Sequence, residues 1–165
     1  QGGFAGEGVI PREQQLEKFR GMRTCPTFNL NGAPKAALAA AVSPRFSDRR
    51  FISKNVCHGV YYDQPLHRRF LAEVESLPDS RQRRSLSLIA RGMTEYLRKK
   101  SQGKKFHDPL AAACALDPAL ADWAEVELFR EKGQWGSTLS PGSGTRIITG
   151  YRRERFIAVL FGEAG

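Results

Sequence analysis

The sequence predicts an α/β fold, with an open and mostly parallel sheet, flanking helices and an antiparallel strand edge. Two observations support this class. Segments with apolar residues at helical spacing are interleaved with short segments typical of strands, and the later strands follow each other closely. The composition, 41% hydrophobic and 26% charged over 165 residues, is that of a globular domain with a real core. We therefore expect residues 1–165 to form a single domain.

In the first half of the chain, prolines and apolar spacing define the expected elements. Residues 13–19 have the pattern of a short helix, and residues 35–42 form an alanine-rich helix that follows Pro34. Residues 50–57 carry Phe51, Ile52 and Val56 and are typical of a strand. Residues 65–77 have apolar side chains at helical spacing and stop before Pro78.

The second half contains the clearest helix, over residues 85–100. Its apolar stripe consists of Leu86, Ile89, Met93, Tyr96 and Leu97. A helix over residues 110–116 follows Asp108-Pro109, and residues 124–129 alternate apolar and acidic side chains like a half-buried strand. We expect a turn at Lys132-Gly133, a last strand that begins at residue 147, and a closing helix over residues 152–161.

Cysteine usage and hydropathy limit the class of protein. The chain has no apolar run that approaches a membrane span and no secretion signal at its start, which indicates a cytoplasmic protein without a membrane partner. Cys25, Cys57 and Cys114 are odd in number and widely spaced, which argues against a disulfide framework and against structural zinc. A nucleophilic pair of Cys57 and His58 is conceivable, but neighbours on a strand point to opposite faces. We expect His58 to be structural.

The most informative stretch is Lys104 to Ala113, which places His107 beside Asp108 at a junction between a loop and a helix. Such junctions often hold catalytic groups in α/β enzymes. The alternative needs no chemistry, because Asp108 fits the N-cap and Pro109 fits the first helical position.

The segment His107-Asp108-Pro109-Leu110-Ala111 resembles the late active-site motif of the inosine-uridine nucleoside hydrolase family. Near the start, residues 2–6 resemble that family's Gly-Gly loop. Residues 27–29, Thr-Phe-Asn, resemble its Glu-Phe-Asn triplet, and residues 31–37 resemble its Asp-Pro-Glu-Ala-Ala helix start. These landmarks keep their order and rough separation across most of the chain.

The resemblance implies hydrolysis of the N-glycosidic bond of a ribonucleoside to ribose and base, at a calcium site. It implies that Asp108 is a calcium ligand and that His107 is the acid near the leaving base. Asn29 would bind a ribose hydroxyl, with Thr27 and Phe28 in the same substrate-binding triplet. Tyr96, from a region that closes over the base in this family, would stack on it; the alternative is that Tyr96 belongs only to its helix's apolar stripe.

The chain departs from the family pattern in its acidic residues. The family's Asp-Thr-Asp-x-Gly-x-Asp-Asp signature is absent, the first aspartate is Asp48, and Thr27 replaces a glutamate. Calcium takes about six to eight oxygen ligands, so Asp108 cannot form the site alone. We expect the chain to be the C-terminal half of a nucleoside hydrolase-like domain, inactive alone, that associates with an N-terminal half or with itself.

Charge supports a second class of function. The formal net charge is +9, and residues 81–105 hold nine basic side chains against one acid, Glu95. The alternative is thus a non-catalytic protein that uses this basic face to bind nucleic acid or another anionic partner. Nucleic acid is less favoured than the hydrolase, because aromatic residues are not interleaved as a stacking platform and no RNA-binding signature occurs. A solvated helix face would also explain the charge.

Overall fold

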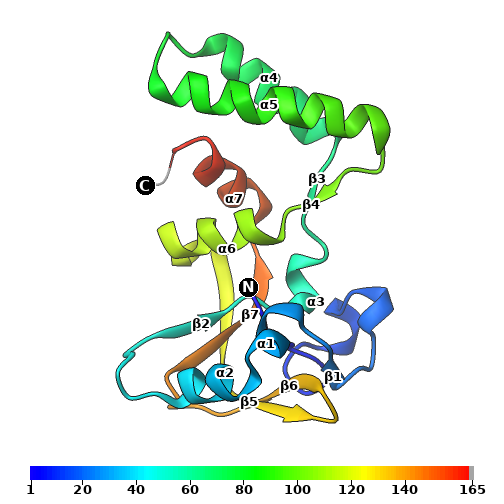
Figure 1. Ribbon diagram of the computed structural model, residues 1–165, viewed down its shortest axis with the longest axis vertical. Helices are drawn as coiled ribbons and strands as arrows, with labels where there is room; N and C mark the ends of the chain where they lie inside the picture. Colours follow the sequence, from blue (N-terminus) through cyan, green and yellow to red (C-terminus); the bar gives the residue numbers. More distant parts are fainter. Residues whose placement is uncertain (164–165) are drawn as a thin grey trace.

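The computed structural model describes residues 1–163, and its lower body is an open five-stranded sheet flanked by helices (Figure 1). The strand order is β1 (Thr24–Cys25), β6 (Gln134–Leu139), β5 (Ala121–Glu131), β7 (Thr145–Tyr151) and β2 (Arg49–Phe51). The mixed α/β class is confirmed. The expected parallel majority is wrong, because only the β2–β7 pair of this sheet is parallel. Strands β5 and β6 are joined by a two-residue turn, which only antiparallel neighbours allow, and β7 pairs antiparallel with the first part of β5.

The turn between β5 and β6 is the one that the sequence predicts. Lys132 and Gly133 both have positive φ, 48° and 80°, as a two-residue hairpin of type I′ requires. Glu131 pairs with Gln134 directly beside this turn. The expected strand over 124–129 therefore extends to the turn and forms a hairpin with β6, a strand that the pattern did not indicate.

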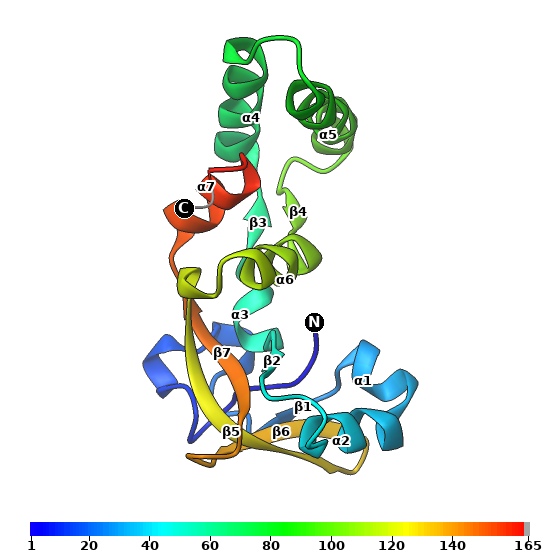
Figure 2. The ribbon, with the colours of Figure 1, turned by 90° about the vertical axis from the view of Figure 1, so that its left-hand side faces the viewer.

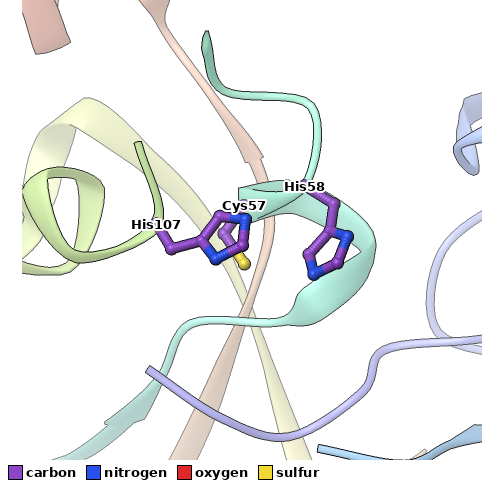
Figure 3. A group of neighbouring side chains, drawn as sticks. All are labelled: Cys57, His58 and His107. Carbon is purple, nitrogen blue, oxygen red and sulfur yellow. The ribbon is translucent and has the colours of Figure 1, made fainter. Parts of the chain in front are cut away.

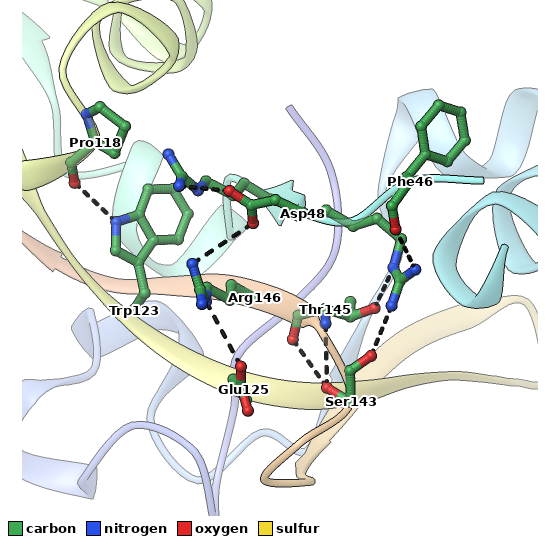
Figure 4. A network of polar contacts seen from close by, with 10 residues as sticks. Phe46, Asp48, Pro118, Trp123, Glu125, Ser143, Thr145 and Arg146 are labelled. Atoms are coloured by element: carbon green, nitrogen blue, oxygen red, sulfur yellow. Dashed lines mark hydrogen bonds and ion pairs between the residues drawn. The ribbon is translucent and has the colours of Figure 1, made fainter. Parts of the chain in front are cut away.

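Polar side chains fix the parallel edge strand β2 beside β7 (Figure 4). The Arg146 guanidinium lies 3.7 Å from carboxylate oxygens of both Asp48 and Glu125. Arg49 Nε donates to Thr145 Oγ1 at 2.8 Å. These contacts join the short strand to both central strands of the sheet.

Seven helices accompany the strands in residues 1–163. They are α1 (Phe28–Gly32), α2 (Pro34–Val42), α3 (Lys54–Cys57), α4 (Gln64–Ser76), α5 (Arg81–Lys99), α6 (His107–Leu116) and α7 (Arg153–Leu160). The helices expected over 35–42, 65–77, 85–100 and 152–161 are confirmed to within a few residues. Two 3₁₀ turns, Arg12–Gln14 and Glu17–Phe19, replace the helix expected over 13–19. None of the helices in this part of the chain combines the length and apolarity needed to cross a bilayer.

Two local expectations are wrong at the segments that later form the site. The strand expected over 50–57 ends at Phe51, because Ser53 Oγ accepts a hydrogen bond from Asn55 N and starts α3. Cys57 therefore lies in a helical turn. Helix α6 begins at His107, with Phe106 at the N-cap, so Asp108 lies inside the first turn instead of capping it. A carboxylate there still stabilises the positive end of the helix dipole.

Helices α4 and α5 form a hairpin that stands above the body, joined to it by the antiparallel pair β3 (Tyr61–Tyr62) and β4 (Lys104–Lys105) (Figures 1 and 2). Helix α7 packs against α4. The Phe70 and Phe161 rings lie 4.9 Å apart, and Arg69 pairs with Glu154 at 2.7 Å. One cluster of buried apolar residues is continuous from the sheet to this hairpin.

A buried histidine on α4, His67, contacts Thr94 on α5 and Tyr62 on β3. His67 is 6% exposed, and Thr94 Oγ1 lies 3.1 Å from its Nε2. Thr94 already donates to the Ala90 carbonyl, so it accepts from Nε2–H, and the Tyr62 hydroxyl donates to Nδ1 at 3.0 Å. This arrangement requires a neutral imidazole. Burial accordingly lowers the pKa of His67.

Stability should fall as the pH drops from 7.5 to 5.5. Burial lowers the pKa of His67 in the folded chain, whereas in the unfolded chain it takes up a proton near its ordinary pKa of about 6.5. The unfolded state thus binds more protons and is favoured by acid. Urea denaturation at both pH values, on wild type and on His67→Gln, measures this contribution. An equal pH slope in the two proteins would contradict it.

Candidate functional site

A cleft of about 830 Å³ lies where the C-terminal end of α5 and strand β4 meet the start of α6. Its chemistry-bearing side chains are Tyr61, Tyr96, Lys100, Lys104, Lys105, His107 and Asp108. The size is within the range of small-molecule sites, about 300–1,000 Å³. Two tyrosines, an imidazole and a carboxylate thus share one opening with three lysines.

A close approach of two backbone segments builds one wall of this cleft. Gly103 has φ +93°, and a Cβ there would lie 2.7 Å from the carbonyl oxygen of Tyr62. Phe106 N then donates to the Val60 carbonyl at 2.9 Å, and its ring lies 5.0 Å from that of Tyr62. These contacts fix the residue directly before His107.

His107 meets Cys57 and His58 beneath the start of α6 (Figure 3). The two imidazole rings stack with centroids 4.6 Å apart and an interplanar angle of 14°. One potential ligand atom from each of the three side chains lies within 4.8 Å of the others. Cys57 is fully buried, and His107 Nε2 is buried without a hydrogen-bond partner among the described residues. We call these three residues the Cys-His-His cluster.

Burial and neighbouring lysines lower the pKa of both imidazoles of the cluster. Burial, followed by Lys18, lowers the pKa of His58 to about 3; the Lys18 Nζ lies 2.8 Å from His58 Nδ1. Burial and Lys105 lower the pKa of His107. Burial raises the pKa of the Cys57 thiol to about 11. The pKa of His107 therefore lies below the ordinary value for histidine, about 6.5.

The structure brings His107, Asp108 and Tyr96 together in the cleft. Tyr96 also packs against the core, so it serves both the apolar stripe of α5 and the cleft wall. Lys104 Nζ lies 5.0 Å from the Tyr96 ring centroid, a cation–π contact that holds the ring at the opening.

Residues 27–29 do not line this cleft. Phe28 is 94% exposed, and the buried Thr27 Oγ1 has no hydrogen-bond partner in residues 1–163. Asn29 donates from Nδ2 to the Gln1 carbonyl at 2.8 Å and to Gln1 Oε1 at 3.2 Å. Gln1 Nε2 in turn donates to Cys57 Sγ at 3.6 Å, so Asn29 is connected to the Cys-His-His cluster through one residue.

The residues present do not fit calcium. Among residues 1–163, Asp108 is the one carboxylate on the cleft wall, and the cluster beside it offers sulfur and nitrogen atoms. Calcium takes oxygen ligands, and one carboxylate is far short of its coordination number. We therefore assign calcium no role in what this chain does alone.

Sequence reasoning missed the partnership of Cys57 and His58 with His107. The adjacency of Cys57 and His58 was the available signal, but a strand assignment placed them on opposite faces. No protein-family model matches the chain, and no curated protein sequence matches it.

Proposed function

We propose that this chain is a nucleoside hydrolase-like protein whose cleft binds a ribonucleoside. The observation that supports it most is the placement of His107 and Asp108 in the first turn of α6, on the wall of a cleft that also contains Tyr61 and Tyr96. The tyrosine rings offer stacking surfaces for a base. The Asp108 carboxylate offers an acceptor for ribose hydroxyls.

The reaction proposed is hydrolysis of the N-glycosidic bond. The bond between the sugar carbon C1′ and the base nitrogen breaks, its electron pair stays on the base, and water supplies the new C1′–O bond. His107 is the residue proposed to donate a proton to the departing base, a role that contributes about 10²–10⁴-fold in rate. Because burial lowers its pKa, the protonated form that this step requires is favoured at acid pH. Apart from Asp108, the described residues place no carboxylate on the cleft wall that would stabilise the cationic sugar, so we propose that the others come from another polypeptide.

Nucleoside binding to this chain tests the proposal without requiring turnover. We expect inosine and uridine to bind in isothermal titration. Tyr96→Ala should raise the Kd by about 5- to 150-fold, because stacking on an aromatic ring contributes about 1–3 kcal/mol per base. Tyr96→Phe should retain most of the affinity. Phe46→Ala is the matched control, since Phe46 is 55% exposed and outside the cleft.

Failure of both nucleosides to bind, or equal affinity of wild type and Tyr96→Ala, would contradict the proposal. Release of ribose from inosine by this chain alone would support the substrate but contradict the need for further carboxylates.

A second candidate is binding of an anionic partner such as nucleic acid through the basic face of residues 81–105. Eight of its nine basic side chains are exposed, and Lys100, Lys104 and Lys105 extend this face into the cleft. Binding of single-stranded RNA that weakens steeply with salt, together with no nucleoside binding, would favour this function over the first.

A further inference from the structure

We propose that the Cys-His-His cluster binds a divalent transition-metal ion, with zinc as the ion whose ligand preferences it matches. Thiolate sulfur and imidazole nitrogen are the usual donors to zinc in proteins. The evidence for this metal site does not use the proposed nucleoside function. His107 belongs to both sites, however, and an imidazole bound to metal could not also donate the proton proposed for it there.

The unpartnered nitrogen of His107 is the observation that points to a ligand. Its Nε2 is buried, without a hydrogen-bond partner in the described part of the chain, and the ring extends toward Cys57 and His58 (Figure 3). A buried polar atom without a partner is unfavourable, because it has given up its hydrogen bonds to water. A metal ion at this position would provide the partner that no protein atom supplies.

The spacing of the ligands is close to what zinc requires. Zinc lies about 2.0–2.1 Å from imidazole nitrogen and about 2.3 Å from sulfur, so tetrahedral ligand atoms are separated by about 3.3–3.6 Å. The ligand atoms of the cluster lie within 4.8 Å of one another. An imidazole lone pair lies in the plane of its ring, and the His58 and His107 rings are stacked nearly parallel. To bind one ion together with Cys57, one of these rings must turn out of the stack as the gap closes. Three protein ligands leave one tetrahedral position open for water or a small ligand.

Two lysines contact His58 Nδ1 and must move if the ion binds through that nitrogen and not through Nε2. Lys18 Nζ lies 2.8 Å and Lys105 Nζ 3.5 Å from His58 Nδ1, and both side chains belong to exposed residues with long flexible stems. On binding, the Cys57 thiol releases its proton to solvent as the metal–sulfur bond forms. The negative charge of the thiolate then offsets part of the positive charge of the ion. Gln1 Nε2 already donates to this sulfur at 3.6 Å and would stabilise the thiolate.

Metal titration of the whole chain tests the site. We expect one zinc ion per chain in a competition assay with a chromogenic chelator, and no comparable binding of calcium. Cobalt, used as a spectroscopic substitute for zinc, should give a thiolate-to-cobalt charge-transfer band. Cys57→Ser should abolish that band, and His58→Ala and His107→Ala should each weaken zinc binding by more than about 10–100-fold, the loss typical for an indirect partner of a metal ligand.

Cys114→Ser is the matched control, because Cys114 is also a buried cysteine but lies outside the cluster. Circular dichroism of each variant separates loss of the site from loss of the fold, and His58→Ala provides a test at a half-buried position if Cys57→Ser does not fold. Absence of zinc binding, or equal zinc affinity in wild type and His58→Ala, would overturn the proposal. Because nucleosides are not present, neither result depends on the proposed hydrolase function.

Discussion

Replacing Trp135 with alanine should lower the free energy of unfolding by about 3–5 kcal/mol. The indole is fully buried on β6, where Trp135 pairs with Cys25 of β1 and Arg130 of β5. Its Nε1–H donates to Asn31 Oδ1 at 2.8 Å. Truncation therefore removes the largest fully buried side chain, leaves a cavity and loses a hydrogen bond. The free energy of unfolding of a folded domain is only about 5–15 kcal/mol in total, so the variant should unfold at a much lower urea concentration than wild type.

Two further variants separate the causes of this loss. Asn31→Ala leaves the indole in place but removes its acceptor, together with the hydrogen bond from Asn31 Nδ2 to the Gly133 carbonyl, and should lower the free energy of unfolding by about 1–3 kcal/mol. Phe28→Ala should change stability by less than about 0.5 kcal/mol, because Phe28 is 94% exposed. Urea denaturation followed by circular dichroism gives all three values. A loss below about 1 kcal/mol for Trp135→Ala would show that the sheet edge formed by β1 and β6 contributes little to folding.

The amphipathic helices and the hairpin turn were predictable because their signals are local. The apolar stripe of α5 and the Lys132-Gly133 dipeptide each determine backbone geometry within a few residues. Strand β6 has no such signal. Within this strand, a Cβ at Gly136 would lie 2.3 Å from the Phe129 ring. The need for glycine here therefore comes from a neighbouring side chain on β5. Pairing across the sheet, and not the alternation of its own side chains, makes this segment a strand.

The candidate site was predictable in part for the same reason. The position of His107 and Asp108 at the start of a helix follows from the adjacent proline and the alanine-rich run. The contact between His107 and Cys57 does not, because it depends on Ser53 ending a strand and starting a helical turn. A hydroxyl that accepts a backbone hydrogen bond competes with strand pairing, and sequence pattern alone did not show which would prevail.

An aromatic column connects the helical hairpin to the candidate site. The ring of Phe70 on α4 lies 4.9 Å from Phe161 and 5.1 Å from Tyr62, and the Tyr62 ring lies 5.0 Å from Phe106. Phe106 directly precedes His107. The packing of α4 on α7 is thus continuous with the residues that position the imidazole of the site.

Phe70→Ala should therefore lower the free energy of unfolding by about 3–5 kcal/mol and weaken the packing of the α4–α5 hairpin on α7. Phe70 is 2% exposed, whereas the adjacent Leu71 is 40% exposed, so Leu71→Ala is a matched control that should cost far less. Hydrogen exchange of the α4 and α5 amides should accelerate in Phe70→Ala before that of β5 and β7, because the hairpin is attached to the body through α7, β3 and β4. Equal acceleration in helices and sheet would instead show that the hairpin and body unfold as one unit, with the aromatic column as part of a single cooperative core.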